Sequence, residues 1–96
     1  MEKINVNNPC KIIESKRKRY TSYYNIPAVE AVVLPKKFYG DQILCDVMWK
    51  DDAGEVKSKT DLMFDGANLQ RLNPMKDFML YTMWESTTKK ESVQTV

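Results

Sequence analysis

Hydrophobic and polar residues alternate most regularly over Gln42–Lys50 (QILCDVMWK). A β-strand here places four apolar side chains on one face: Ile43, Cys45, Val47 and Trp49. Residues 51–54 (DDAG) have the composition of a turn, and residues 55–64 alternate again, which predicts a return strand. The pattern therefore predicts a β-hairpin, with Cys45 in the core and Asp46 paired across the sheet with a lysine of the return strand.

Shorter apolar runs on both sides of the hairpin predict further strands. Residues 11–14 (KIIE) are expected to form a short first strand, with Cys10 and Ile12 on the same face. Residues 28–34 (AVEAVVL) lie between two prolines and contain three β-branched valines, which favours a strand over a helix. Residues 35–41 are expected to form a loop. Residues 67–72 are expected to form one 3₁₀ turn that buries Leu69 and Leu72.

Residues 75–85 (MKDFMLYTMWE) fit either a helix or a strand. Asn73 and Pro74 form a typical helix start, whereas a strand would place apolar side chains on both of its faces. The strand is the preferred interpretation, and a C-terminal helix is the alternative. Either conformation leaves apolar surface that one small domain hardly covers. We therefore expect a protein interface that includes six residues: Met75, Phe78, Met79, Tyr81, Met83 and Trp84.

The length of 96 residues, with 43% hydrophobic residues, is typical of one globular domain with its own core. Residues 1–10 are polar and contain a turn signal at residues 7–9 (NNP), so they predict an N-terminal arm. Residues 11–85 are expected to form the domain. Residues 86–96 (STTKKESVQTV) have the composition of a disordered C-terminal tail.

Four segments, in this order, resemble SH3-like small β-barrels, including the Tudor-type branch: IPAVEAV (26–32), YGDQILCDVMWKD (39–51), DAG (52–54) and NLQRL (68–72). The resemblance covers residues 26–72 and implies an all-β fold, a small SH3-like (Tudor-like) barrel with extended termini. Tudor-type domains hold methyl-lysine in a cage of clustered aromatic side chains. Phe38, Tyr39, Trp49 and Phe64 are available here, but their spacing matches no cage motif, so no ligand residue is carried over.

The residue types argue against an enzyme. The chain has no histidine, which excludes Ser-His-Asp and Cys-His catalysis and nearly every catalytic zinc site. The acidic residues around the predicted hairpin turn lack the spacing of an EF-hand loop, and the three glycines are too scattered to cradle a phosphate. We therefore expect no catalytic residue, cofactor, metal or small-molecule substrate.

The two cysteines, Cys10 and Cys45, fit neither a disulfide framework nor a zinc site. Reduced thiols are the expected state, although the spacing leaves a Cys10–Cys45 bridge open. The sequence shows neither a secretory signal nor an apolar run long enough to cross a membrane. The expected location is thus the cytoplasm, as a reducing compartment, or an assembled virion, and no membrane partner is expected.

A basic segment interleaved with tyrosines is the main functional signal. Residues 1–40 carry eight Lys/Arg and three Asp/Glu, a net charge of +5, whereas residues 41–96 carry seven and ten, a net charge of −3. Such an asymmetry suits a polyanion, or complementary faces between copies or partner subunits. A solvated loop is expected to contact a partner protein or nucleic acid, with cations on phosphates and tyrosines on bases: Lys16, Arg17, Lys18, Arg19, Tyr20, Tyr23 and Tyr24.

Two functions from different classes follow from these signals. The first is a non-enzymatic structural or interaction protein, a subunit of a larger assembly that contacts other protein subunits. Its concrete form is an accessory or capsid-decorating protein of a virus or phage particle, a choice that rests on small size and on no motif. The alternative is an SH3-like nucleic-acid-binding accessory protein that uses the basic-aromatic loop.

Overall fold

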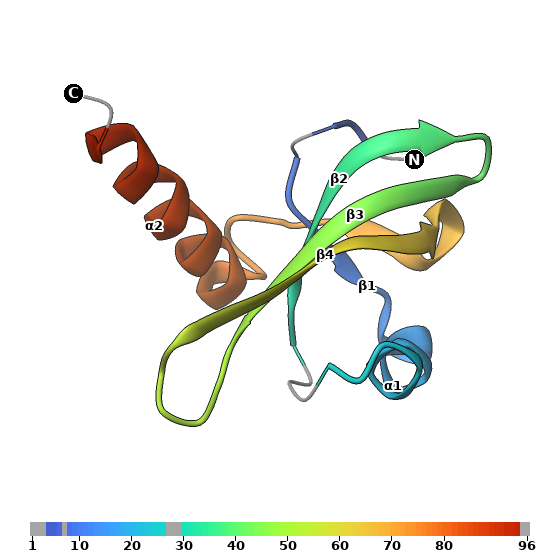
Figure 1. The fold of residues 1–96 in the computed structure, drawn as a ribbon, viewed down its shortest axis with the longest axis horizontal. Coiled ribbons are helices and arrows are strands. Elements are labelled where there is room, and N and C mark those ends of the chain that lie inside the picture. Colours follow the sequence, from blue (N-terminus) through green and yellow to red (C-terminus); the bar gives the residue numbers. More distant parts are fainter. Residues whose placement is uncertain (1–3, 7, 27–29, 95–96) are drawn as a thin grey trace.

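The strands form one five-stranded antiparallel sheet in the order β4-β3-β2-β1-β5 (Figure 1). The computed structural model describes residues 4–6, 8–26 and 30–94. Its elements are β1 (Cys10–Ile12), α1 (Glu14–Tyr23), β2 (Val32–Tyr39), β3 (Gln42–Lys50), β4 (Val56–Asp65), the 3₁₀ turn η1 (Gly66–Asn68), β5 (Leu69–Arg71) and α2 (Phe78–Gln94). The predicted all-β fold is confirmed in part, because the structure is mostly β-sheet but also contains the helices α1 and α2. A closed barrel is not confirmed, because β4 and β5 remain the two edges of the sheet in the described part of the chain.

The predicted hairpin is confirmed, and its first strand, β3, lies inside the sheet between β2 and β4. Its four alternating apolar side chains are buried, as the period of two requires. The turn is closed by Asp51, whose Oδ1 accepts hydrogen bonds from the backbone amides of Ala53 and Glu55, both at 2.9 Å. Gly54 follows in the left-handed region at φ +83°, which a glycine adopts without strain.

The two faces of the sheet carry two separate hydrophobic clusters. The larger one contains both cysteines and lies on the face that α1 and η1 approach: Cys10, Ile12, Ile26, Ala31, Val33, Ile43, Cys45, Val47, Trp49, Phe64 and Leu69. The smaller one centres on Val32, Leu72 and Met83, where α2 packs on β2. The predicted burial of Cys45, Leu69 and Leu72 is confirmed.

Two β-bulges flank Asp46 in the middle of β3. Between β2 and β3 the register skips Lys36, and between β3 and β4 the strand β4 carries one extra residue near Asp61. The bulges bring both residues to Asp46, whose Oδ1 lies 3.2 Å from Lys36 Nζ and 3.1 Å from the amide nitrogen of Asp61. The predicted pairing of Asp46 with a lysine of the return strand was therefore wrong, because the bulge in β2 supplies the lysine instead.

Of the segment expected to be a loop over residues 35–41, residues 35–39 belong to strand β2, whereas residues 40–41 form the expected turn before β3. Pro35 is compatible with this strand because β1 pairs with β2 only at Cys10↔Val33 in the described part of the chain. Beyond that point no strand on the β1 side needs the amide hydrogen that proline lacks. Of the predicted strand over residues 28–34, residues 28 and 29 lie outside the described residues.

The basic segment forms the helix α1, so the prediction of a loop was wrong. A ten-residue helix rich in like charges has only marginal stability by itself. The N-cap residue of α1, Ile13, makes no side-chain hydrogen bond that would cap the helix. Tertiary contacts supply the missing stability: Tyr20 and Tyr24, four residues apart, pack on the larger cluster. Lysine and arginine are good helix formers, so the sequence does not oppose this conformation once it is anchored.

The C-terminal segment is also helical, so the preferred strand for residues 75–85 was wrong and the alternative was right. Asn73 decides the outcome, because its Oδ1 accepts hydrogen bonds from the amides of Met75 at 2.8 Å and Lys76 at 3.1 Å. Residues 86–94, expected to be a disordered tail, continue this helix to Gln94. None of the described helices is long and apolar enough to span a membrane.

Candidate functional site

Tyr20 of α1 and Tyr24, the residue directly after the helix, pack on Phe64 of β4 and fix the helix to the sheet. The ring centroids of Tyr20 and Tyr24 lie 4.7 and 5.4 Å from that of Phe64, and the two tyrosine rings stack at 6.1 Å. Tyr23 lies on the exposed side and touches Tyr24 edgewise, with a centroid distance of 4.8 Å. The aromatic residues of the basic segment are therefore mainly anchors.

The hydroxyl groups of the same two tyrosines cover the outer edge of β4. Tyr24 Oη donates a hydrogen bond to the carbonyl of Met63. Tyr20 Oη accepts from the amide of Asp65 at 3.4 Å, and from Nδ2 of Asn68 at 2.8 Å. Burial raises the pKa of Tyr24 above its ordinary value. The rings and hydroxyls of Tyr20 and Tyr24 thus already make contacts within the chain, whereas Tyr23 is exposed.

The four cations of α1 point to different sides, because consecutive residues of a helix are rotated by about 100°. Lys18 and Arg19 are exposed, whereas Lys16 and Arg17 are half-buried. The ion pairs found among the described residues involve other lysines, so none of the four cations of α1 is neutralised by a carboxylate there. Their positive charge remains available to a partner.

The predicted apolar interface divides into a buried part and an exposed part. Met83 is buried in the smaller cluster, and Tyr81 and Trp84 pack beside it with their rings 5.3 Å apart. In contrast, Met75, Phe78 and Met79 expose 89%, 66% and 80% of their surface. Phe78 and Met79 are the first two residues of α2, and Met75 lies in the turn before it. Together they form an exposed apolar surface.

An ion pair with Lys11 fixes the beginning of α2 to β1. Lys11 Nζ lies 2.6 Å from Asp77 Oδ1, and Asp77 Oδ2 accepts a hydrogen bond from the amide of Asn73 at 2.8 Å. Burial opposes the charge of Asp77, but the amide of Asn73 and the ammonium of Lys11 outweigh it and hold the pKa of Asp77 below its ordinary value. The exposed residues Phe78 and Met79 are thus held on a rigid support.

A depression of about 210 Å³ lies beside these exposed residues. Its lining comes from Glu30 and from the beginning of α2: Lys76, Asp77, Phe78, Met79 and Leu80. This volume is roughly seven times the volume that one molecule occupies in liquid water, so the depression is large enough for an apolar side chain of a partner.

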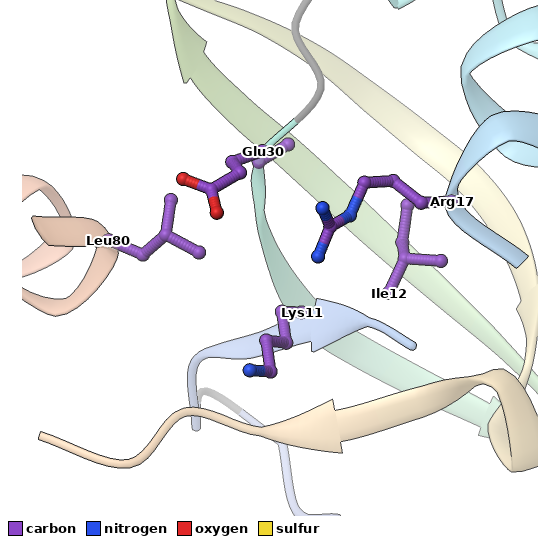
Figure 2. Close-up of a pocket in the computed structure, with 6 residues that line it drawn as sticks. Lys11, Ile12, Arg17, Glu30 and Leu80 are labelled. Atoms are coloured by element: carbon purple, nitrogen blue, oxygen red, sulfur yellow. The ribbon is translucent and has the colours of Figure 1, made fainter. Parts of the chain in front are cut away.

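A second, much smaller cavity adjoins the first and connects it to α1. Figure 2 shows Arg17 from α1 and Glu30 from the segment before β2 projecting towards the same space, with Lys11 from β1 and Leu80 from α2 around it. Its volume of about 10 Å³ admits a single water at most. Glu30 and Leu80 line both cavities, so they join the basic helix to the apolar surface. We call the six residues that line or flank this junction the Leu80 surface: Arg17, Glu30, Lys76, Phe78, Met79 and Leu80.

The structure brings together two segments that the sequence treated separately, the basic segment and the apolar segment. Arg17 and Phe78 were singled out from the sequence, whereas Glu30, Lys76 and Leu80 were missed. The sequence signal that could have identified Leu80 is the helix start at Asn73 and Pro74. In a helix that follows this start, Leu80 and Met83 are three residues apart and lie on the same face.

The described residues offer no obvious chemical centre. Among them, no group of three or more His, Cys, Asp or Glu is placed to hold a metal ion. Cys10 and Cys45 are both buried, and burial raises the pKa of the Cys45 thiol to about 12. A thiol with such a pKa is a poor nucleophile at neutral pH. The chain matches no protein-family model, no curated protein and no solved structure.

Proposed function

We propose that the protein is a non-enzymatic interaction protein, a subunit of a larger assembly that contacts a neighbouring protein through the Leu80 surface. The observation that carries this proposal is the exposure of Phe78 and Met79 beside a depression on a rigid support. Large apolar side chains gathered on a surface are typical of protein interfaces, and methionine and phenylalanine are enriched there.

The physical gain from such a contact is substantial. Fully burying one phenylalanine or methionine side chain stabilises a complex by roughly 1.5–3 kcal/mol. The half-buried Arg17 and the exposed Lys76 flank the apolar residues, so a partner with acidic groups around an apolar centre fits this surface. Charge at the rim of an interface contributes mainly to partner choice and association rate.

The fold supports a relationship to SH3-like small barrels as part of this proposal. Strands β1 to β4 are neighbours in chain order, and the 3₁₀ turn η1 precedes β5, which returns to pair with β1. The resemblance rested on a similar order, with one 3₁₀ turn over residues 67–72 and a last strand or helix over residues 75–85, whereas the returning strand is β5 at Leu69–Arg71. The specific assignment to an accessory or capsid-decorating protein of a virus or phage particle rests on the small size of the chain. A reducing compartment is part of the proposal because two cysteines at this spacing fit no disulfide framework.

A photoreactive phenylalanine analogue at position 79 tests the proposal in the cells or particles that contain the protein. We expect a covalent adduct with a protein after irradiation, because this side chain is 80% exposed on the proposed interface. The matched control places the analogue at Phe38, which is also exposed but lies on β2, away from the Leu80 surface. The absence of any protein adduct from position 79 would contradict the proposed function.

Nucleic-acid binding through α1 is the second candidate, favoured by the four cations that no described carboxylate neutralises. Since Tyr20 and Tyr24 are engaged on β4, we propose contacts with phosphates without base stacking. Replacing Lys16, Arg17, Lys18 and Arg19 by serine is expected to abolish binding and flatten its dependence on salt. If the unaltered protein binds neither DNA nor RNA at about 50 mM salt, where phosphate contacts are strong, this candidate is excluded.

A further inference from the structure

The β3–β4 turn is an acidic projection with a chemistry opposite to that of the Leu80 surface. Residues 51–55 (DDAGE) carry three carboxylates, and the hairpin extends well away from the body of the sheet (Figure 1). Asp51 is held inward by the amides of the turn, whereas Asp52 and Glu55 are exposed. Val56, directly after them, exposes 46% of its surface. The projection therefore presents two carboxylates next to an apolar side chain.

The carboxylates of this projection differ in how far they are already neutralised. Glu55 lies 3.2 Å from Lys57 Nζ, and Asp51 lies 3.9 Å from the same atom. Asp52 makes no ion pair with any described residue. Asp52 is thus the carboxylate with the most unsatisfied charge, and it lies at the turn itself.

The Leu80 surface has the complementary arrangement of an apolar centre with free cations beside it. Lys11 is already paired with Asp77, so its positive charge is compensated by that carboxylate. Arg17 and Lys76 form no ion pair with described residues, and Glu30 is the single unpaired acid in the lining of the two cavities. An incoming carboxylate would therefore meet Arg17 and Lys76, while an apolar side chain would meet Phe78 and Met79.

We propose that the β3–β4 turn of one copy of this chain docks on the Leu80 surface of a second copy. This inference rests on the proposed function and names the neighbouring protein as the chain itself. Asp52 lies against Arg17 and Lys76 of the second copy, and Val56 lies against Phe78 and Met79. Residues of the turn line neither cavity of their own chain, so each copy leaves its own Leu80 surface open.

A contact between two different patches has a definite consequence for the assembly. Two copies that dock reciprocally, each turn on the Leu80 surface of the other, form a closed dimer. Copies that use the turn towards one neighbour and the Leu80 surface towards another form a ring or a filament. One small turn covers less area than the 1,200–2,000 Å² or so of a stable protein interface, so a single contact is weak. We therefore expect association that increases with protein concentration and decreases with salt.

Charge reversal on either side of the contact tests this inference by sedimentation velocity at low salt. The turn variant combines Asp52→Lys and Glu55→Lys, and the surface variant combines Arg17→Glu and Lys76→Glu. Each variant alone is expected to lose at least about tenfold in association constant, because like charges then face each other. An equimolar mixture of the two variants is expected to regain association, because each turn then meets an opposite charge on the other variant. Lys37→Glu, at an exposed cation of β2 outside both patches, is the control and is expected to associate like the unaltered chain.

Three results would overturn the inference. The first is that the unaltered chain stays monomeric at every concentration at which it is soluble. The second is that the turn variant alone still associates. The third is that the mixture of the two variants fails to regain association. Circular dichroism of each variant checks that the fold is retained. The photoreactive residue at position 79 separates this inference from the proposed function. An adduct with a different protein and none with a second copy leaves the proposed function standing and removes this inference.

Discussion

Asp46 Oδ1 accepts a hydrogen bond from the backbone amide of Asp61 at 3.1 Å, across the bulge in β4. Asp61 has a φ of +60°, a conformation that costs a residue with a side chain some free energy. Lys36 Nζ lies 2.7 Å from the carboxylate of Asp61 and 3.2 Å from that of Asp46, so one lysine from β2 links both strands. Asp46 is thus the residue that holds two irregular strands in register.

Replacing Asp46 by alanine is expected to lower the free energy of unfolding by about 1–2 kcal/mol, because the amide of Asp61 loses its acceptor. Urea unfolding followed by circular dichroism measures this change. Asp52→Ala, at a carboxylate without a described hydrogen bond, is the control and is expected to stay within about 0.5 kcal/mol of the unaltered chain. Equal losses for the two variants would contradict the role given to Asp46.

Tyr24→Phe is expected to lower the free energy of unfolding by about 0.5–1.5 kcal/mol, because the carbonyl of Met63 on the edge of β4 loses its donor. Tyr23→Phe is the matched control, since Tyr23 is exposed and its hydroxyl makes no described hydrogen bond. Thermal or urea unfolding compares the two variants. If both leave stability unchanged, the hydroxyl of Tyr24 does not anchor α1.

Met83 and Met79 provide a matched pair on one helix, four residues apart and of the same type. Met83 is only 7% exposed, so Met83→Ala is expected to cost about 2–5 kcal/mol of stability. Met79→Ala is expected to leave stability within about 0.5 kcal/mol, because this side chain is exposed. The second variant is instead expected to weaken association. The reverse result in unfolding experiments would mean that α2 packs with a different face.

The Lys11–Asp77 pair predicts a specific dependence of stability on pH. The pKa of Asp77 is lower in the folded protein than in the unfolded chain, where it is about 3.9 for an aspartate. Ionised Asp77 therefore contributes stability above about pH 4, and this contribution is lost as the pH falls through the folded-state pKa. Asp77→Asn is expected to be less stable at pH 7 and to show a smaller loss between about pH 4 and pH 2. Glu85→Gln, at an exposed acid of α2, is the control, and equal changes in stability for the two variants would contradict the role given to the Lys11–Asp77 pair.

The burial of both thiols predicts that they react slowly with thiol reagents. With a pKa of about 12, Cys45 carries almost no thiolate at pH 8, and both Cys10 and Cys45 are inaccessible. Native protein is expected to react with a thiol reagent only at the rate at which it unfolds, whereas protein in urea is expected to react at both cysteines. Rapid labelling of one cysteine under native conditions would show that the core opens locally.

The hairpin could be predicted from the sequence because a period of two and an acidic turn with Gly54 are local signals. Helix α1 could not, because its stability comes from contacts of Tyr20 and Tyr24 with Phe64, some 40 residues away in the chain. The apolar segment was ambiguous for a related reason. Its apolar residues serve two surfaces, with Met83 inside and Met79 outside, so no single period appears in the sequence.

The Leu80 surface could be predicted only in part. The sequence pointed to Arg17 and Phe78 as contact residues, because a run of cations and an excess of apolar residues are visible without a structure. Their proximity depends on how α1, β1 and α2 meet around Glu30 and Leu80. No short motif joins these elements, so their meeting had to come from tertiary structure.

The edge of β4 also affects how densely copies of the chain can pack without aggregating. The hydroxyls of Tyr24 and Tyr20 occupy this edge at Met63 and Asp65, the bulge distorts it near Asp61, and Lys57 and Lys59 charge the remainder. Lysines and bulges on an edge strand prevent another strand from adding to the sheet. Neighbouring copies can therefore reach a high local concentration in an assembly while strand addition at the β4 edge remains blocked, and contacts along this edge are left to side chains.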